Sequence, residues 1–218
     1  MVVKTLRRWL TAAIAVTVFV LFSIHFVDRP LARLLARFHM YQGVLVSPQV
    51  HIPVLIVLAS FAVLLGARSL SARERFPKWA VAAVLAGLAL AWSLCLTEFV
   101  LKPLFGRAFP SDYLQYGQYA FLWFQYSDAY RSFPSGHADQ AMAIASVLWG
   151  FYPRWRWIYV VALAGLAGAL LLGEWHFLSD LVAGGFIGAA AGALMMQIWK
   201  SIEGSKFESS ASASDRTG

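Results

Sequence analysis

The sequence is poor in charged residues, and this shortage excludes most soluble folds. Only 13% of its 218 residues are charged and 60% are hydrophobic, whereas a soluble globular domain is about a quarter charged and about half apolar. Its single cysteine, Cys95, excludes a disulfide within the chain. The net charge of +7 is better explained by basic residues that anchor membrane spans than by nucleic-acid binding. We therefore expect an integral membrane protein.

Long apolar runs predict where the chain crosses the membrane, because a span needs about 20 predominantly apolar residues. Six transmembrane helices are expected, at residues 9–27, 51–70, 79–101, 137–153, 156–173 and 178–200. The predicted fold class is therefore all-α, a polytopic membrane bundle formed by one domain at residues 1–202. In the last span, Gly184, Gly188 and Gly192 predict a face for close helix packing. The polar, Ser-rich segment 203–218 is expected to be a disordered tail.

A short amphipathic helix is predicted between the first two spans, at Pro30–Met40. Its leucines and Phe38 fall on one face of a helix, and Arg33 and Arg37 fall on another. Such a helix either lies on the membrane surface or packs on the bundle, and the sequence favours neither arrangement.

The basic residues predict the orientation of the chain in the membrane. Six spans place both termini on one side, and that side carries twelve of the eighteen Lys and Arg residues, while the other side carries six. Because basic residues are enriched on the cytoplasmic side, we expect both termini to be cytoplasmic. In a bacterium the protein would lie in the inner membrane, with its opposite face toward the periplasm or the exterior.

Residues suited to phosphate chemistry gather on that opposite face. They lie in four segments: 102–110 after the third span, 131–137 before the fourth, His176 after the fifth, and Asp180 at the start of the sixth. Lys102 and Arg107 would offset the negative charge of a phosphate. The Ser135-Gly136 turn, at the start of a helix, would add backbone N–H donors.

The two histidines are suited to transfer a phosphoryl group. His176 would attack phosphorus if its other ring nitrogen donates to Asp180, and His137 would protonate the leaving oxygen and then activate water. This scheme needs no metal and no other cofactor, since two histidines without further ligands are too few for a zinc site.

These motifs resemble those of the type-2 phosphatidic acid phosphatase / vanadium haloperoxidase superfamily. That family carries a Lys and an Arg-Pro separated by six residues, then Pro-Ser-Gly-His, then Ser-Arg, five residues, His, three residues and Asp. Here Pro134–His137 matches the second motif in full, and His176 and Asp180 match the third. The resemblance implies a membrane helical bundle, a nucleophilic His176, a general acid/base His137, and phosphate contacts from Lys102, Ser135 and Gly136.

The sequence departs from the family pattern at both arginines. Phe109 stands where the first arginine is expected, and Leu170 stands where the second is expected. Arg107 and Arg131 lie near in sequence and are interpreted as their substitutes in binding phosphate. Glu98 lies one turn before Lys102 inside an apolar helix, where we expect it to pair with Lys102 and orient it.

The sequence thus predicts an integral-membrane phosphatase that hydrolyses a phosphate monoester or pyrophosphate of a lipid through a phosphohistidine. Two alternatives stay open: a phosphotransferase that passes the phosphoryl group to another acceptor, and a non-catalytic lipid-binding protein. The expected partners are a lipid phosphate and membrane lipids, with no nucleic acid, and the sequence favours no particular lipid or oligomeric state.

Overall fold

The computed structural model describes residues 2–38 and 77–214, with side chains described in 6–38 and 77–203. The elements, in chain order, are α1 (Val2–Phe22), η1 (Ser23–Val27), α2 (Asp28–Ala36), α4 (Lys78–Cys95), η3 (Leu96–Leu101), α5 (Lys102–Phe105), α6 (Pro110–Tyr116), η4 (Asp128–Tyr130), α7 (Gly136–Phe151), η5 (Pro153–Trp155), α8 (Arg156–Leu172) and α9 (Leu178–Ser214). Within the two described ranges β-type pairing is confined to isolated bridges, which join Arg107 to Phe121 and to Arg131. The all-α class is therefore confirmed for this part of the chain.

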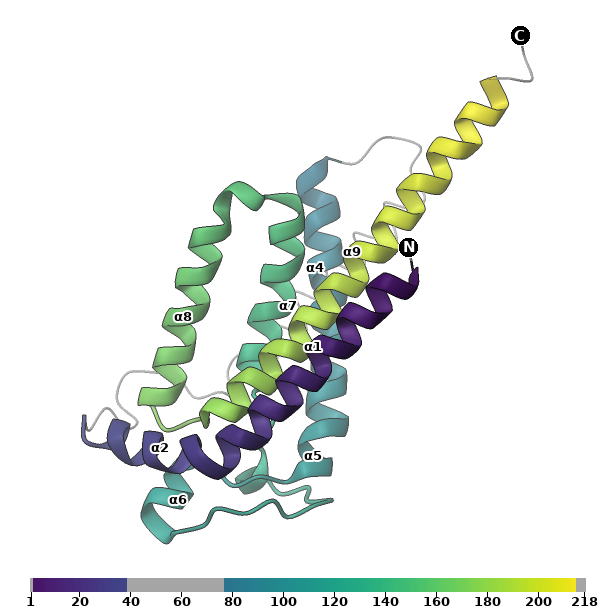
Figure 1. The fold of residues 1–218 in the computed structure, drawn as a ribbon. Helices are drawn as coiled ribbons and strands as arrows, with labels where there is room; N and C mark the ends of the chain where they lie inside the picture. The colour runs from purple at the N-terminus through teal and green to yellow at the C-terminus, as the bar shows by residue number, and fades with distance from the viewer. Residues whose placement is uncertain (1, 39–76, 215–218) are drawn as a thin grey trace.

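Helices α4, α7 and α9 form the centre of the bundle. Each of the three contacts the other two, α1 lies along α9, and α8 contacts α7 from the outside (Figure 1). The start of α1 and the end of α9 lie at one end of the bundle, while the starts of α7 and α9 lie at the other end, beside α5 and α6 (Figure 1). The segments expected to carry the chemistry therefore share one end.

Small side chains let the three central helices approach closely. The buried cluster between them consists of Ala82, Leu85, Ala86, Ala89, Ala143, Val147, Phe151 and Ala191. The α9 glycines lie against α7: a Cβ added at Gly192 would be 2.6 Å from the Cβ of Ser146, and one added at Gly188 would overlap the backbone of Asp139. The predicted small-residue face is thus confirmed as a packing surface.

Four described stretches are long and apolar enough to cross a membrane: Leu6–Ala36, Lys78–Phe105, Pro153–Leu172 and Leu178–Glu203. They correspond to the predicted first, third, fifth and sixth spans. The predicted fourth span is α7, which has 16 residues and lies in the centre of the bundle. The predicted second span, 51–70, lies outside the described residues, so the count of six spans stays a prediction.

The outer surface of the bundle is apolar. Along α8, large apolar side chains point away from the protein and are exposed, among them Trp157, Ile158 and Val161. An extended exposed apolar surface of this kind is typical of a helix that faces lipid. The surface of α8 therefore supports the predicted membrane location.

The predicted amphipathic helix corresponds to α2, which begins at Asp28 and ends at Ala36. It contacts α6 and α8 and lies across the end of the bundle at which α7 and α9 begin (Figure 1). The helix therefore packs on the protein, whereas contact with a membrane surface stays a prediction. At the other end, α9 continues as a helix to Ser214, beyond residue 202, so the predicted tail is not separated from the bundle by a break in the helix.

The glycine face of α9 gives a direct test of the packing. Gly188→Ala should lower the unfolding temperature of the protein in detergent, because an overpacked core position typically costs about 1–3 kcal/mol. Gly165→Ala on α8 is the matched control, since its Cβ would meet nothing within 4 Å. Equal unfolding temperatures for the two variants would contradict the packing described here.

Candidate active site

His176 lies at the centre of the site, in the turn that joins α8 to α9. Its side chain is 4% exposed, and its Nδ1 lies 2.9 Å from the backbone oxygen of Ser132. A carbonyl oxygen can only accept, so Nδ1 of the neutral ring carries the hydrogen and Nε2 keeps a lone pair. The nearest acceptor for Nδ1 is thus Ser132, while the Oδ2 atom of Asp180, the expected acceptor, lies 3.7 Å away.

Asp180 is fully buried and is held from several directions. Its Oδ2 accepts hydrogen bonds from the hydroxyl of Ser132 at 2.6 Å and from the backbone N–H of Phe177 at 2.8 Å. Its Oδ1 accepts from Nη1 of Arg107 at 2.5 Å. Asp180 therefore fixes the turn that carries His176 and provides a negative charge beside the imidazole ring.

His137 and the start of α7 form the opposite wall. The rings of His137 and His176 are 6.2 Å apart between centroids and meet edge to face, so both imidazoles are within reach of one bound phosphate. Ser135 caps α7: its side-chain oxygen accepts from the N–H of Ala138 at 3.3 Å, and its own N–H donates to the backbone oxygen of Asp180 at 3.0 Å. This bond joins the starts of α7 and α9.

Glu98 binds two of the cations expected to contact phosphate. Its Oε1 accepts from Nζ of Lys102 at 2.5 Å and its Oε2 from Nη2 of Arg131 at 2.9 Å. The predicted pairing with Lys102 is therefore observed, and Arg131 joins it. A Cβ at Gly136 would lie 2.6 Å from Glu98 Oε1 and 3.3 Å from Lys102 Nζ, so the absence of a side chain lets these charged groups lie directly against the helix start.

Arg107 lies behind the site, not at its surface. It is 1% exposed, and its guanidinium donates to Asp180, to Asp28 at 2.8 Å and to the hydroxyl of Tyr119 at 2.9 Å. Burial alone would lower the pKa of Arg107, but the attraction of Asp180 and Asp28 raises this pKa above its usual value. The expected phosphate contact of Arg107 stays a prediction, and its observed partners are groups of the protein.

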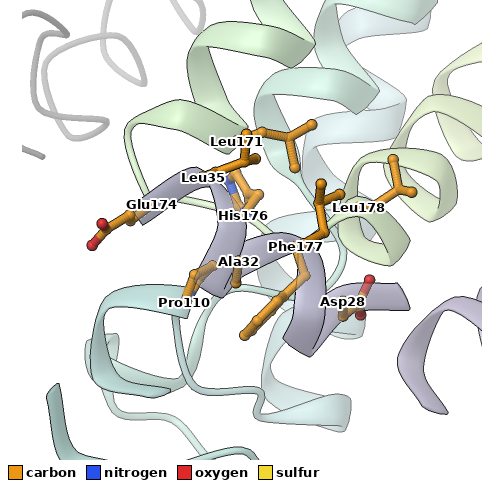
Figure 2. A pocket seen from close by; sticks show the side chains of 10 residues that line it. Asp28, Ala32, Leu35, Pro110, Leu171, Glu174, His176, Phe177 and Leu178 are labelled. Atoms are coloured by element: carbon orange, nitrogen blue, oxygen red, sulfur yellow. The ribbon is translucent and has the colours of Figure 1, made fainter. Parts of the chain in front are cut away.

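A small pocket lies beside His176, between α2 and the turn before α9 (Figure 2). Its walls are mostly apolar and are formed by Asp28, Leu31, Ala32, Leu35, Pro110, Leu171, Glu174, His176, Phe177 and Leu178. Close by, the ring of Phe109 lies 6.3 Å from the ring of His176, and Leu170 is buried. Apolar side chains therefore stand at both positions where the family resemblance implies arginine.

No set of metal ligands accompanies these groups in the described part of the chain. Among those residues, no three His, Cys, Asp or Glu side chains form a group that could hold a metal ion.

Most residues of this site, although not Asp28, lie within one family region. The family model of the PAP2 superfamily matches residues 82–202, more than half of the chain, and that range includes Lys102, His137, His176 and Asp180. The chain belongs to the PAP2 superfamily. With four stretches apolar and long enough to span a bilayer, this PAP2 superfamily member is an integral membrane protein.

Two curated proteins, each described as a lipid A 1-phosphatase, are similar to part of the chain. The protein of Rhizobium johnstonii (strain DSM 114642 / LMG 32736 / 3841) is 32% identical over 90 residues, which are 41% of this chain and 37% of that protein. The protein of Rhizobium etli (strain ATCC 51251 / DSM 11541 / JCM 21823 / NBRC 15573 / CFN 42) is 32% identical over 85 residues, 39% of this chain and 37% of that protein. The matches thus span little more than a third of each relative's length.

A solved structure also aligns with the chain. It is the crystal structure of the first transmembrane PAP2 type phosphatidylglycerolphosphate phosphatase from Bacillus subtilis, which is 17% identical. The alignment covers 87% of this chain and 96% of that chain, with a TM-score of 0.45.

Several polar residues of the site in this PAP2 superfamily member were not identified from its sequence. They are the buried Asp28, Ser132 and Ser179 and the half-buried Tyr119. Burial is the main reason that the pKa of Tyr119 rises to about 12, against the opposing attraction of Arg107. The role of Asp28 could have been predicted from the sequence. An acidic residue at the end of an apolar run, like Glu98 inside one, needs a partner in the protein. Ser132 and Tyr119 in loops, and Ser179 in the first turn of α9, carry no such signal.

The proton position on His176 can be measured directly. In protein labelled with ¹⁵N-histidine, at a pH where His176 is neutral, its Nδ1 should be the protonated nitrogen, because Ser132 offers that atom only an acceptor. The His176→Gln variant identifies the signal. A proton on Nε2 of His176 would contradict this geometry.

Proposed function

We propose that this protein is a membrane lipid phosphatase that hydrolyses a phosphate monoester or pyrophosphate through a phosphohistidine on His176, without a metal ion. The observation that carries the proposal is the hydrogen bond from His176 Nδ1 to the backbone oxygen of Ser132 at 2.9 Å. This bond leaves the lone pair on Nε2, and the negative charge of Asp180 lies 3.7 Å from Nδ1. An imidazole held in this way is a prepared nucleophile.

In the first step, Nε2 of His176 attacks phosphorus and the bond from phosphorus to the lipid oxygen breaks. His137 gives its proton to that oxygen, so the lipid leaves as an alcohol, or as a monophosphate if the substrate is a pyrophosphate. The imidazole of His176 gains positive charge as the new N–P bond forms. The carboxylate of Asp180 stabilises that charge.

In the second step, water hydrolyses the phosphohistidine. His137, now neutral, takes a proton from the water while its oxygen attacks phosphorus. The N–P bond then breaks, phosphate leaves, and Nε2 of His176 regains its lone pair. Both histidines end in the protonation states in which they began.

Binding of the phosphate is assigned to cations and donors at the start of α7. Lys102 and Arg131 each donate a hydrogen bond to a different carboxylate oxygen of Glu98, so Glu98 orients both cations. The N terminus of α7 at Gly136 adds the positive end of a helix, and the hydroxyl of Ser135 can donate a further hydrogen bond. Charge-assisted hydrogen bonds of this kind are the strong ones for phosphate.

A lipid is the expected substrate because the reacting groups lie at one end of a bundle of apolar, membrane-length helices. A headgroup would present its phosphate at this level, and the two curated relatives are named lipid A 1-phosphatases. Both termini are assigned to the cytoplasm and the site to the periplasmic or outer face of an inner membrane, because basic residues favour the side of the termini.

One observation favours a second candidate. Phe109 and Leu170 replace both arginines implied by the family resemblance, and Arg107 is bound to Asp180 and Asp28. A site with fewer phosphate-binding cations stabilises the charge of a phosphoryl-transfer transition state less, which favours lipid binding without chemistry. Phosphate release, measured together with phosphoryl transfer to an added alcohol, separates lipid binding and phosphoryl transfer from hydrolysis.

Hydrolysis is tested by phosphate release from a panel of lipid phosphates and pyrophosphates, with EDTA present. We expect release by the purified protein, and His176→Ala should lower the rate at least about a thousandfold because the nucleophile is gone. The matched control is His25→Ala, since the exposed His25 bonds to the backbone oxygen of Leu21, one turn earlier in the chain, and lies outside the site.

Each other result of this assay has one meaning. Release that EDTA abolishes would refute the metal-independent scheme. Release that survives in His176→Ala would refute the phosphohistidine. No release, with phosphoryl transfer appearing on an added lipid or sugar alcohol, would establish a phosphotransferase. Binding of a lipid phosphate with neither release nor transfer would establish the lipid-binding candidate.

The assigned phosphate contact of Arg131 predicts a binding defect. Arg131→Ala should raise KM for the lipid phosphate about tenfold, because a hydrogen bond to a charged group contributes about 1.5–3 kcal/mol, while kcat changes less. Arg154→Ala is the matched control, since the guanidinium of Arg154 lies over the ring of Trp155, outside the site. An unchanged KM would remove Arg131 from the binding site.

A further inference from the structure

Asp28 is part of the first apolar segment of the chain, yet its carboxylate lies at the site. It accepts hydrogen bonds from the backbone N–H of Ser179 at 3.1 Å, from the hydroxyl of Ser179 at 2.5 Å and from Nη2 of Arg107 at 2.8 Å. The hydroxyl of Ser23 donates to it at 2.8 Å. Asp28 is 1% exposed, so these contacts are shielded from water.

These contacts connect four charged or ionisable side chains in succession: Asp28, Arg107, Asp180 and His176. Asp28 binds Nη2 of Arg107, Nη1 of Arg107 binds Oδ1 of Asp180, and the other oxygen of Asp180 lies 3.7 Å from His176 Nδ1. Every member is at most 4% exposed. The rings of Phe121 and Phe177 lie 4.9 and 4.2 Å from the guanidinium carbon and exclude water from it.

The same contacts set the net charge beside the nucleophile. The guanidinium of Arg107 and the carboxylates of Asp28 and Asp180 together carry one net negative charge, and His176 lies next to Asp180. As Nε2 of His176 bonds to phosphorus, the ring becomes positive and that charge is stabilised. If Asp28 were neutral, Arg107 would cancel the charge of Asp180, and the stabilisation would be lost.

We propose that Asp28 is a positioning residue for the reaction, which acts through Arg107 to hold Asp180 in place and to keep its negative charge effective at His176. This inference rests on the function proposed above. It gives the first apolar segment a part in the chemistry, although Asp28 lies 148 positions before His176 in the sequence.

The test is the isosteric variant Asp28→Asn, made in the wild-type and in the Asp180→Asn background. In the wild type, Asp28→Asn should lower kcat about tenfold, as expected for loss of a hydrogen bond to a charged group, with KM changed less than about twofold. In Asp180→Asn it should lower kcat less than about twofold, because the residue through which it acts is already altered. Asp112→Asn is the matched control, since Asp112 bonds only to the start of its own helix in the contacts described.

A merely structural role would give a different pattern. Equal losses of kcat in the two backgrounds, or a loss confined to KM, would overturn the proposal. If Asp28→Asn does not yield folded protein, the same pair of backgrounds is measured with Asp28→Glu, which keeps the charge but moves it by one methylene group, and the same criterion applies.

A second readout is independent of turnover and separates failure of this inference from failure of the proposed function. In ¹⁵N-histidine spectra at one fixed pH, Asp28→Asn should shift the ring signals of His176, and Asp112→Asn should not. If the protein releases no phosphate but the shift appears, the phosphatase function fails and the link from Asp28 to His176 holds. Unshifted His176 signals would overturn the link, whatever the activity.

Discussion

The burial of Arg107 between Asp28 and Asp180 is the interaction on which the site depends. A guanidinium at 1% exposure is stable only if opposite charges and hydrogen-bond acceptors surround it, and here two carboxylates, a serine and a tyrosine do so. These partners come from α2, α9 and the loop after α6. One side chain therefore holds together three parts of the chain that are far apart in sequence.

Ser132 connects the backbone near Arg107 to Asp180 and His176. Its N–H donates to the carbonyl of Arg107, its hydroxyl donates to Asp180, and its carbonyl accepts from His176. All three polar groups of one buried residue are used, as expected where water cannot replace a missing partner. The ring of His176 is thus oriented by the loop before α7, and the position of Asp180 follows from the same loop.

The helical scaffold makes this arrangement possible by close packing. The glycines of α9 bring its backbone against α7, and the N–H of Ser135 then reaches the carbonyl of Asp180. Because the two helix starts are joined in this way, His137 on α7 and His176 before α9 face each other across 6.2 Å. Packing along the bundle and geometry at its end are therefore coupled.

The sequence by itself determined the helical class, most helix positions, the pairing of Lys102 with Glu98, and the presence of His137, His176 and Asp180 at one end of the bundle. These follow from apolar run length, from helical spacing and from short motifs, all of which act locally. Only the tertiary structure decided that Arg107 is buried, that it joins Asp28 to Asp180, that Asp28 also binds Ser179, and that Ser132 is the acceptor for His176. Such pairings join residues up to 151 positions apart, and they depend on helix packing that no local pattern specifies.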